Sequence, residues 1–197
     1  MEIDEANLIA HSRQGDLDAF NRLVEHYQRP VYNLCLRMLA CRQAAEDATQ
    51  DAFIAAYRAL DSFRGGSFRA WLFRIAANAC YDELRRRRSR PAVSLEAPEG
   101  HPLELHHPGP PMEEHAQRLE LARYLQEALA ALPANQRLAV ILCDVQGLDY
   151  EEIAQATGVS LGTVKSRISR ARARLRGILL AHRELFPIPF RPSGEGT

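Results

Sequence analysis

The 197-residue sequence contains little lysine and little cysteine. Lys165 is the only lysine, so nearly all of the positive charge is carried by arginine. The four cysteines, Cys35, Cys41, Cys80 and Cys143, form no C-x-x-C pair and lie in apolar, helical surroundings. Such spacing favours reduced thiols in a cytosolic protein over a disulfide framework or a zinc site.

Targeting signals and catalytic motifs are also missing. Residues 1–16 are acidic and lack the basic and apolar parts of a signal peptide, and no apolar run approaches the length that crosses a bilayer. We therefore expect a cytoplasmic protein without membrane insertion. Because the sequence has no Walker loop, metal-binding cluster or activated nucleophile, an enzyme is the least favoured class, and we expect neither a metal nor a cofactor.

The charge that is present is unevenly distributed. Lysine plus arginine equals aspartate plus glutamate, at 25 each. Residues 85–90 are nearly all arginine, residues 91–115 hold five glutamates and no lysine or arginine, and residues 160–176 hold six basic residues and no acidic one. The neutral total therefore conceals two basic sites with an acidic connection between them.

Hydrophobic periodicity is helical almost everywhere and indicates no strand, so we expect an all-α fold of two small helical domains. The first domain covers residues 1–90 and the second residues 116–182. Between them, residues 91–115 contain six prolines and four histidines and predict a flexible linker. A metal role for these histidines is disfavoured because a flexible segment offers no fixed ligand geometry. Residues 183–197 predict a disordered tail.

Residues 148–176 predict a helix-turn-helix. Tyr150 to Thr157 forms the first helix, Gly158 turns the chain, and Ser160 is placed to cap the second helix. One face of the second helix is apolar, through Val164, Ile168, Ala171 and Leu175, and the other carries Gly162, Thr163, Ser166, Ser169, Arg170 and Ala173. An ordinary charged helical hairpin would mix charge signs. The uniform basic charge favours DNA binding, with the second helix in the major groove.

The helix expected over residues 43–60 has two unlike faces. Alanines dominate one face and allow close packing against a neighbouring helix. The other face gathers Asp47, Gln50 and Asp51 around Ile54. A solvated polar face and a protein-docking surface are equally compatible with this pattern.

A loop at residues 61–68 mixes aromatic, basic and glycine residues, and a long helix follows it. On that helix Trp71, Arg74, Asn78, Tyr81 and Arg85 recur at steps of three and four residues. Aromatic, amide and guanidinium groups along one stripe suit unpaired nucleic acid, since rings stack on bases and arginine binds phosphate. A core position is the competing interpretation of Trp71.

Two long motifs resemble bacterial sigma factors of the extracytoplasmic-function class. They are AAEDATQDAFIAAYRALDSFRGGSFRAWLFRIAANACYDELRRRRSR and LPANQRLAVILCDVQGLDYEEIAQATGVSLGTVKSRISRARARLR. The resemblance covers about residues 5–90 and 115–180, in the family's order on either side of a variable linker. It implies a sigma region 2-like helical bundle and a sigma region 4-like four-helix domain.

The resemblance also implies roles for particular residues. The face formed by Asp47, Gln50, Asp51 and Ile54 would dock on the clamp helices of the largest RNA polymerase subunit. The loop would capture a flipped base of the −10 promoter element, and the stripe on the following helix would hold the separated strand. The loop residues are Phe63, Arg64, Gly65, Gly66, Ser67 and Phe68, and the stripe residues are Trp71, Arg74, Asn78 and Arg85. The basic helix would read the −35 element through Thr163, Lys165, Ser166, Arg167, Ser169, Arg170 and Arg174.

The partners implied by the resemblance are core RNA polymerase (clamp helices and flap region), promoter DNA and an anti-sigma factor. The competing hypothesis is an ordinary helix-turn-helix regulator whose first half dimerises or senses a ligand. That half shows no receiver or ligand-pocket pattern. Transcription from defined start sites with core polymerase would separate the two hypotheses.

Overall fold

The computed structural model describes residues 4–89 and 112–181, with side chains from residue 119 onward in the second range. Every regular element in these ranges is helical, which confirms the all-α prediction. The elements are α1 (Glu5–Arg13), α2 (Leu17–Leu39), α3 (Arg42–Ala59), the short helix η1 (Leu60–Ser62), α4 (Phe68–Ser89), α5 (Met112–Ala130), α6 (Ala134–Val140), the π-helix η2 (Ile141–Val145), α7 (Tyr150–Thr157) and α8 (Leu161–Leu180).

Local capping explains where several helices begin. The Asp16 carboxylate accepts a hydrogen bond of 3.0 Å from the amide of Ala19 at the start of α2. At α7, Asp149 and Glu152 form a reciprocal capping box, and each accepts from the other's main-chain N–H. Helix α2 continues past Pro30 without a break.

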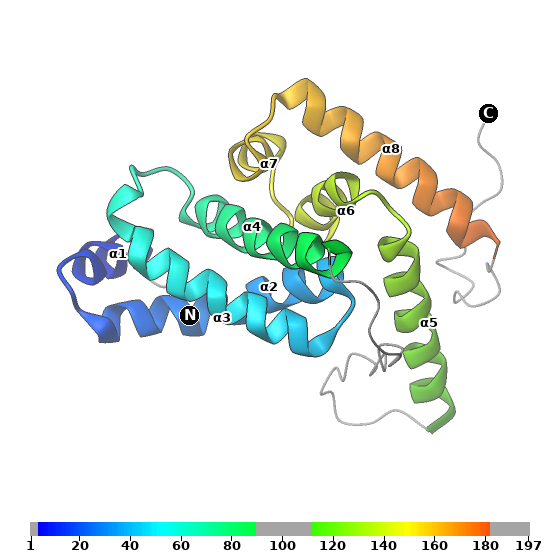
Figure 1. The fold of residues 1–197 in the computed structure, drawn as a ribbon, viewed down its shortest axis with the longest axis horizontal. Helices are drawn as coiled ribbons and strands as arrows, with labels where there is room; N and C mark the ends of the chain where they lie inside the picture. Colours follow the sequence, from blue (N-terminus) through cyan, green and yellow to red (C-terminus); the bar gives the residue numbers. More distant parts are fainter. Residues whose placement is uncertain (1–3, 90–111, 182–197) are drawn as a thin grey trace.

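Helices α1 to α4 form the N-terminal unit, which occupies one side of the molecule in Figure 1. Its core lies where α2 and α4 face each other. The alanine face of α3 covers this core, as the small side chains predict, with Ala45, Ala52 and Ala56 fully buried. The largest fully buried side chains here are Phe68, Phe73, Leu23, Leu34, Met38 and Leu72.

Helices α5 to α8 form the C-terminal unit, in which α6 packs across α8. Helix α5 begins at Met112, so the segment expected to be linker up to residue 115 already contains helical residues. The remainder of that linker and the predicted tail, residues 183–197, lie outside the described residues. The helix-turn-helix has the predicted form, with Gly158 left-handed at φ 67° and the Ser160 hydroxyl accepting from the amide of Thr163.

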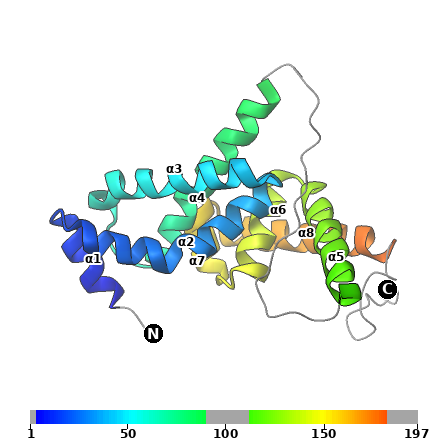
Figure 2. The same ribbon diagram turned by 90° about the horizontal axis from the view of Figure 1, so that it is seen from below.

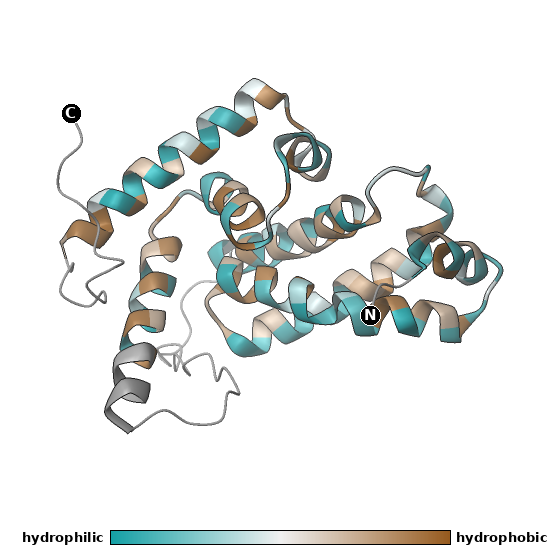
Figure 3. Cartoon of the chain, turned by 180° about the vertical axis from the view of Figure 1, so that it is seen from behind, coloured by the Kyte–Doolittle hydropathy of each residue, from teal (hydrophilic) through white to brown (hydrophobic). Residues whose placement is uncertain are grey.

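The two units pack directly against each other. Helix α7 lies along α4, and α5, α6 and η2 contact α2, as Figures 1 and 2 show. A single cluster of buried side chains extends from Leu34 and Phe73 in the N-terminal unit to Ile141, Leu142 and Ile153 in the C-terminal unit. Figure 3 shows hydrophobic residues recurring along the helices of both units. The sequence did not predict the contact.

The four cysteines are free thiols, as expected; Cys35 and Cys80 are buried and Cys41 and Cys143 are partly buried. Among the described helices, none combines the length and the apolar character that crossing a lipid bilayer requires.

Candidate nucleic-acid and protein interfaces

The orientation of α8 is fixed by its apolar face. Val164, Ile168 and Ala171 are buried against the rest of the C-terminal unit. The opposite face is therefore turned to solvent, and Figure 3 shows hydrophilic residues alternating with hydrophobic ones along α8. The predicted DNA-facing residues with exposed side chains are Lys165, Ser169, Arg170 and Arg174. This part of the predicted site is brought together on one surface.

Two further predicted residues, Thr163 and Ser166, are engaged in local hydrogen bonds. The hydroxyls of Thr163 and Ser160 lie 3.0 Å apart, and the Ser166 hydroxyl donates to the carbonyl oxygen of Thr163 at 3.0 Å. Each hydroxyl oxygen keeps a lone pair that can accept from a base amino group. These bonds hold the side chains in defined positions at the start of the helix.

Other arginines of α8 turn away from the exposed stripe. Arg172 binds the Asp144 carboxylate with two hydrogen bonds, of 3.1 Å and 2.5 Å. The Arg172 guanidinium thereby lowers the pKa of Asp144. Arg167 is half-buried and lies close enough to Tyr81 of α4 to influence its phenol. It thus faces the N-terminal unit in this arrangement.

The loop between η1 and α4 is built on an aromatic cluster. The rings of Phe63, Phe68 and Trp71 lie 5.4–5.5 Å apart, centroid to centroid. Phe68 is 1% exposed and Phe63 8% exposed, so both rings are buried in the core and anchor the loop to it. Trp71 is half-buried in the same cluster, in agreement with the core interpretation of this residue.

The exposed tip of this loop is Arg64-Gly65-Gly66. Both glycines have positive φ, at 94° and 86°, a backbone conformation that side-chain-bearing residues rarely adopt. Ser67 is half-buried, and its hydroxyl accepts from the amide of Ala70 at the start of α4. The tip therefore offers backbone groups and one guanidinium, while the phenylalanines fix its shape.

Along α4, the stripe predicted from spacing is exposed at Arg74, Asn78 and Arg85. A cavity of about 430 Å³ opens beside Asn78, Tyr81 and Arg85 and is bounded on its far side by Ala134 of α6. Burial raises the pKa of Tyr81, so its hydroxyl stays protonated and can donate. The lining combines an amide, a phenol and two guanidinium groups, which suit a nucleotide, with the Asp82 carboxylate, which does not suit its phosphate.

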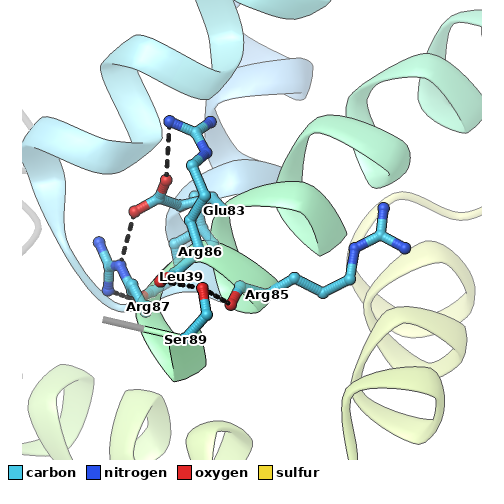
Figure 4. Close-up of polar contacts among 6 residues, drawn as sticks. All are labelled: Leu39, Glu83, Arg85, Arg86, Arg87 and Ser89. Atoms are coloured by element: carbon cyan, nitrogen blue, oxygen red, sulfur yellow. Dashed lines mark hydrogen bonds and ion pairs between the residues drawn. The ribbon is translucent and has the colours of Figure 1, made fainter. Parts of the chain in front are cut away.

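The arginine run at the end of α4 is largely paired with acidic residues of the same helix. Glu83 accepts from Arg87 at 2.8 Å and lies 3.4 Å from Arg86, as Figure 4 shows. Arg87 also donates to the carbonyl oxygen of Leu39 at the end of α2. Arg85 extends away from this group and pairs with Asp82.

The polar face of α3 is exposed as predicted. Asp47, Gln50 and Asp51 all have exposed side chains, and Ile54 is 43% exposed among them. Tyr57, one turn further along α3, is 37% exposed and extends the apolar part of this surface. Sequence reasoning overlooked Tyr57, although its spacing of three residues from Ile54 places both on one helix face.

No group of histidine, cysteine, aspartate and glutamate in residues 4–89 and 112–181 has the arrangement of a metal site. The candidate surfaces described so far are an exposed basic helix, a glycine loop followed by a polar stripe, and an acidic face around Ile54.

Two family models match the chain, one to each unit. Sigma-70 region 2 matches residues 23–90, and Sigma-70, region 4 matches residues 122–175. Each unit therefore carries a different sigma-factor region, in the order that the sequence motifs indicated.

Several curated relatives match along most of the chain. The ECF RNA polymerase sigma factor SigM of Mycobacterium tuberculosis is 37% identical over 179 residues, which cover 90% of this chain and 86% of SigM. The ECF RNA polymerase sigma-E factor of Escherichia coli is 38% identical and covers 87% of this chain and 92% of the relative. SigE of Mycolicibacterium smegmatis is 41% identical over 86% of this chain, which spans 65% of that relative.

Two solved structures share the fold along the chain. CnrH in complex with the cytosolic domain of CnrY is 31% identical, with a TM-score of 0.67 and coverage of 88% of this chain and 96% of CnrH. RpoE from Bartonella quintana in complex with the anti-sigma factor NepR is 31% identical, with a TM-score of 0.65 and coverage of 81% and 96%. The chain belongs to the extracytoplasmic-function class of RNA polymerase sigma factors.

Proposed function

We propose that this protein directs core RNA polymerase to specific promoters by binding the −35 element through α8 and the −10 element through the loop at residues 63–68 and α4. The observation that carries the proposal is that one chain presents two separate surfaces whose chemistry suits nucleic acid. One is a basic helix suited to the major groove, and the other is a loop and polar stripe suited to unpaired bases. A simple regulator needs only the first surface.

Within the −10 site, the aromatic cluster of Phe63, Phe68 and Trp71 acts as the support of the loop. Extruding a base from a duplex costs a few kcal/mol of stacking and pairing. The backbone of Gly65 and Gly66 and the exposed side chains of Arg64 and Asn78 offset that cost by binding the extruded base and its strand. Arg74 and Arg85 hold the neighbouring phosphates.

Partner binding uses the acidic face of α3. Ile54, exposed among Asp47, Gln50 and Asp51, supplies the apolar centre of a polymerase-docking surface with a charged rim. The C-terminal unit contributes a second contact at the polymerase flap. The complex of RpoE with the anti-sigma factor NepR supports an anti-sigma factor as a third partner of this chain. The protein acts by binding alone and leaves catalysis to the polymerase.

Run-off transcription on a randomised promoter library tests the proposal. We expect discrete start sites when this chain is added to core polymerase, and sequencing of the transcripts identifies both promoter elements. Duplex binding without any start-site-specific transcript would identify a simple regulator instead.

The double variant Gln50→Ala/Asp51→Ala tests the docking surface. We expect weaker core-polymerase binding with an unchanged circular dichroism spectrum, because both side chains are exposed. The matched control is Glu25→Ala/Gln28→Ala, which removes the same chemical groups from an exposed face of α2. Equal losses in the two variants, or unfolding of the first, would contradict a docking role for α3.

A further inference from the structure

Helix α1 is far from the loop at residues 63–68 (the −10 loop) in the sequence, yet it is connected to both ends of that loop in the structure. Immediately before the loop, the Asp61 carboxylate of η1 lies 3.6 Å from the Arg13 guanidinium of α1. At the other end, Glu5 of α1 accepts a hydrogen bond from the Tyr27 hydroxyl of α2. The Tyr27 ring in turn packs on Phe68, with 5.6 Å between the ring centroids. The proposed function leaves this helix without a role.

The connection through Tyr27 is the stronger of the two. The side chains of Arg13 and Asp61 are 41% and 86% exposed, and an ion pair so exposed contributes little. Tyr27, by contrast, is 6% exposed and Glu5 is half-buried. Burial and the hydrogen bond to Glu5 raise the pKa of Tyr27, so its hydroxyl stays protonated and donates. A hydrogen bond to a carboxylate is stronger than one between neutral groups, so this bond fixes the outer end of the Tyr27 ring.

The position of the Tyr27 ring restricts the aromatic cluster that supports the loop. Phe68 contacts the Tyr27 ring and also the rings of Phe63 and Trp71, at 5.5 Å and 5.4 Å. Close-packed interiors transmit small displacements, so a shift of one ring moves its neighbours. Among the described residues, no atom beyond the adjacent residues lies within 4 Å of the position that a Cβ would take on either glycine of the tip. The shape of the tip therefore depends on the two phenylalanines that flank it.

We propose that Glu5 and Tyr27 are positioning residues for base capture, because their hydrogen bond fixes the Phe68 ring and thereby holds the tip of the −10 loop in the conformation that receives the extruded base. This inference rests on the proposed function, which assigns base capture to the loop. A binding site needs its groups placed to within about 0.5 Å. A loop that is already ordered also avoids the entropy cost of ordering on binding. The bond should thus affect base capture more than the phosphate contacts of α4.

The test compares two kinds of fluorescent single strand on holoenzyme assembled from the full chain and core polymerase. One is a non-template −10 oligonucleotide from the selected promoters, and the others are the same oligonucleotide with one −10 base removed. The base whose removal weakens binding most is the captured one. That abasic strand keeps its phosphates but offers no base to the loop. The ratio of the two affinities therefore measures base capture and does not change when folded protein is simply lost.

Two single variants break the bond from either side. Tyr27→Phe keeps the ring and removes the hydroxyl, and Glu5→Ala removes the acceptor. We expect each to lower the affinity ratio by about three- to ten-fold, within the range of coupling through packed side chains. The double variant should lose no more than either single variant, because both act through one bond. Glu5→Gln retains an acceptor oxygen and should keep most of the ratio.

Tyr32→Phe is the matched control. It removes a phenol hydroxyl from a half-buried position on the same helix. The charged neighbours of Tyr32 are Glu46 and Arg42 of α3 rather than residues of the loop, so this variant should leave the affinity ratio unchanged. Thermal melts and binding of the −35 duplex establish that each variant is folded.

A parent-like ratio in folded Tyr27→Phe and Glu5→Ala would overturn the inference and leave base capture intact. Equal weakening on the complete and abasic strands would also overturn it, since it would show a general loss of structure. If Tyr27→Phe does not fold, Glu5→Ala changes only a half-buried side chain and carries the test. A parent holoenzyme that binds the complete and abasic strands alike would refute base capture by the loop, and the positioning role with it.

Discussion

The two arginine-rich surfaces of this protein differ in how their charge is balanced. On α8, Lys165, Arg170 and Arg174 have no acidic side chain within ion-pair distance among the described residues. On α4, Arg85, Arg86 and Arg87 are each paired with Asp82 or Glu83. Similar composition therefore leaves three unpaired cations on the exposed face of α8, whereas the arginine run of α4 is largely self-neutralised.

This difference matches the two kinds of nucleic acid that the surfaces are proposed to bind. Unpaired like charges raise the local potential and gain from counterion release on duplex DNA, where phosphates are dense. On α4 a phosphate must replace an existing carboxylate partner. Ion pairs at the surface contribute only about 0–1 kcal/mol, so replacing the carboxylate with a phosphate costs little. The same carboxylates weaken the sequence-independent attraction between α4 and duplex DNA. We infer that α8 supplies most of the salt-dependent affinity, while α4 acts after the strands separate.

The largest expected effect comes from removing the buried anchor of α8. Ile168 is 2% exposed, and Ile168→Ala should lower the free energy of unfolding by about 2–5 kcal/mol through lost burial and the cavity left behind. Ser169→Ala, at the neighbouring exposed position, should change it by less than about 0.5 kcal/mol. Urea unfolding of the full chain, followed by circular dichroism, measures both. Similar losses in the two variants would contradict the assigned orientation of α8.

This orientation was predictable because its signals are local. The apolar spacing of α8, the glycine at position 158 and the serine cap at position 160 lie within a few turns of one another, and the structure places them as expected. The exposed face of α3 follows from the same kind of pattern. The ends of helices were predicted less accurately, since α8 ends at Leu180 and the prediction ended at Arg176.

The features that sequence reasoning missed depend on long-range contacts. Ser67 and Glu152 are 85 residues apart in the sequence and form a hydrogen bond. No sequence pattern around either residue indicates which residue will be its partner. Phe63 and Phe68 lie in a loop, where no periodicity distinguishes a buried ring from an exposed one; their burial is set by Tyr27 and Trp71. Likewise, Gln146 and Arg137 look like surface residues in the sequence, but both are buried and each donates to a main-chain carbonyl of α2.

A smaller effect should separate base contacts from phosphate contacts on α8. Arg170→Ala should weaken binding to the selected −35 duplex by about 1–3 kcal/mol and relax its sequence preference, if the guanidinium reaches a base edge. Arg172→Ala is the control on the same helix, because Arg172 is held by Asp144 and should change DNA affinity little. Fluorescence anisotropy on matched and scrambled duplexes measures both. Equal weakening by Arg170→Ala on every duplex would identify a phosphate contact.

The smallest effect concerns the self-neutralised surface. Glu83→Gln removes the charged partner of Arg86 and Arg87, whose guanidinium groups are exposed, so α4 should bind single-stranded DNA two- to five-fold more tightly, roughly the ≤1 kcal/mol of a surface ion pair. The salt dependence of that binding should steepen by up to about one phosphate equivalent. Glu46→Gln, which removes an exposed partner of Arg42 on α3, is the matched control and should change neither quantity. An unchanged salt slope in Glu83→Gln would mean that these arginines stay bound to other groups, such as the Leu39 carbonyl, and that Arg85 alone carries the strand contact.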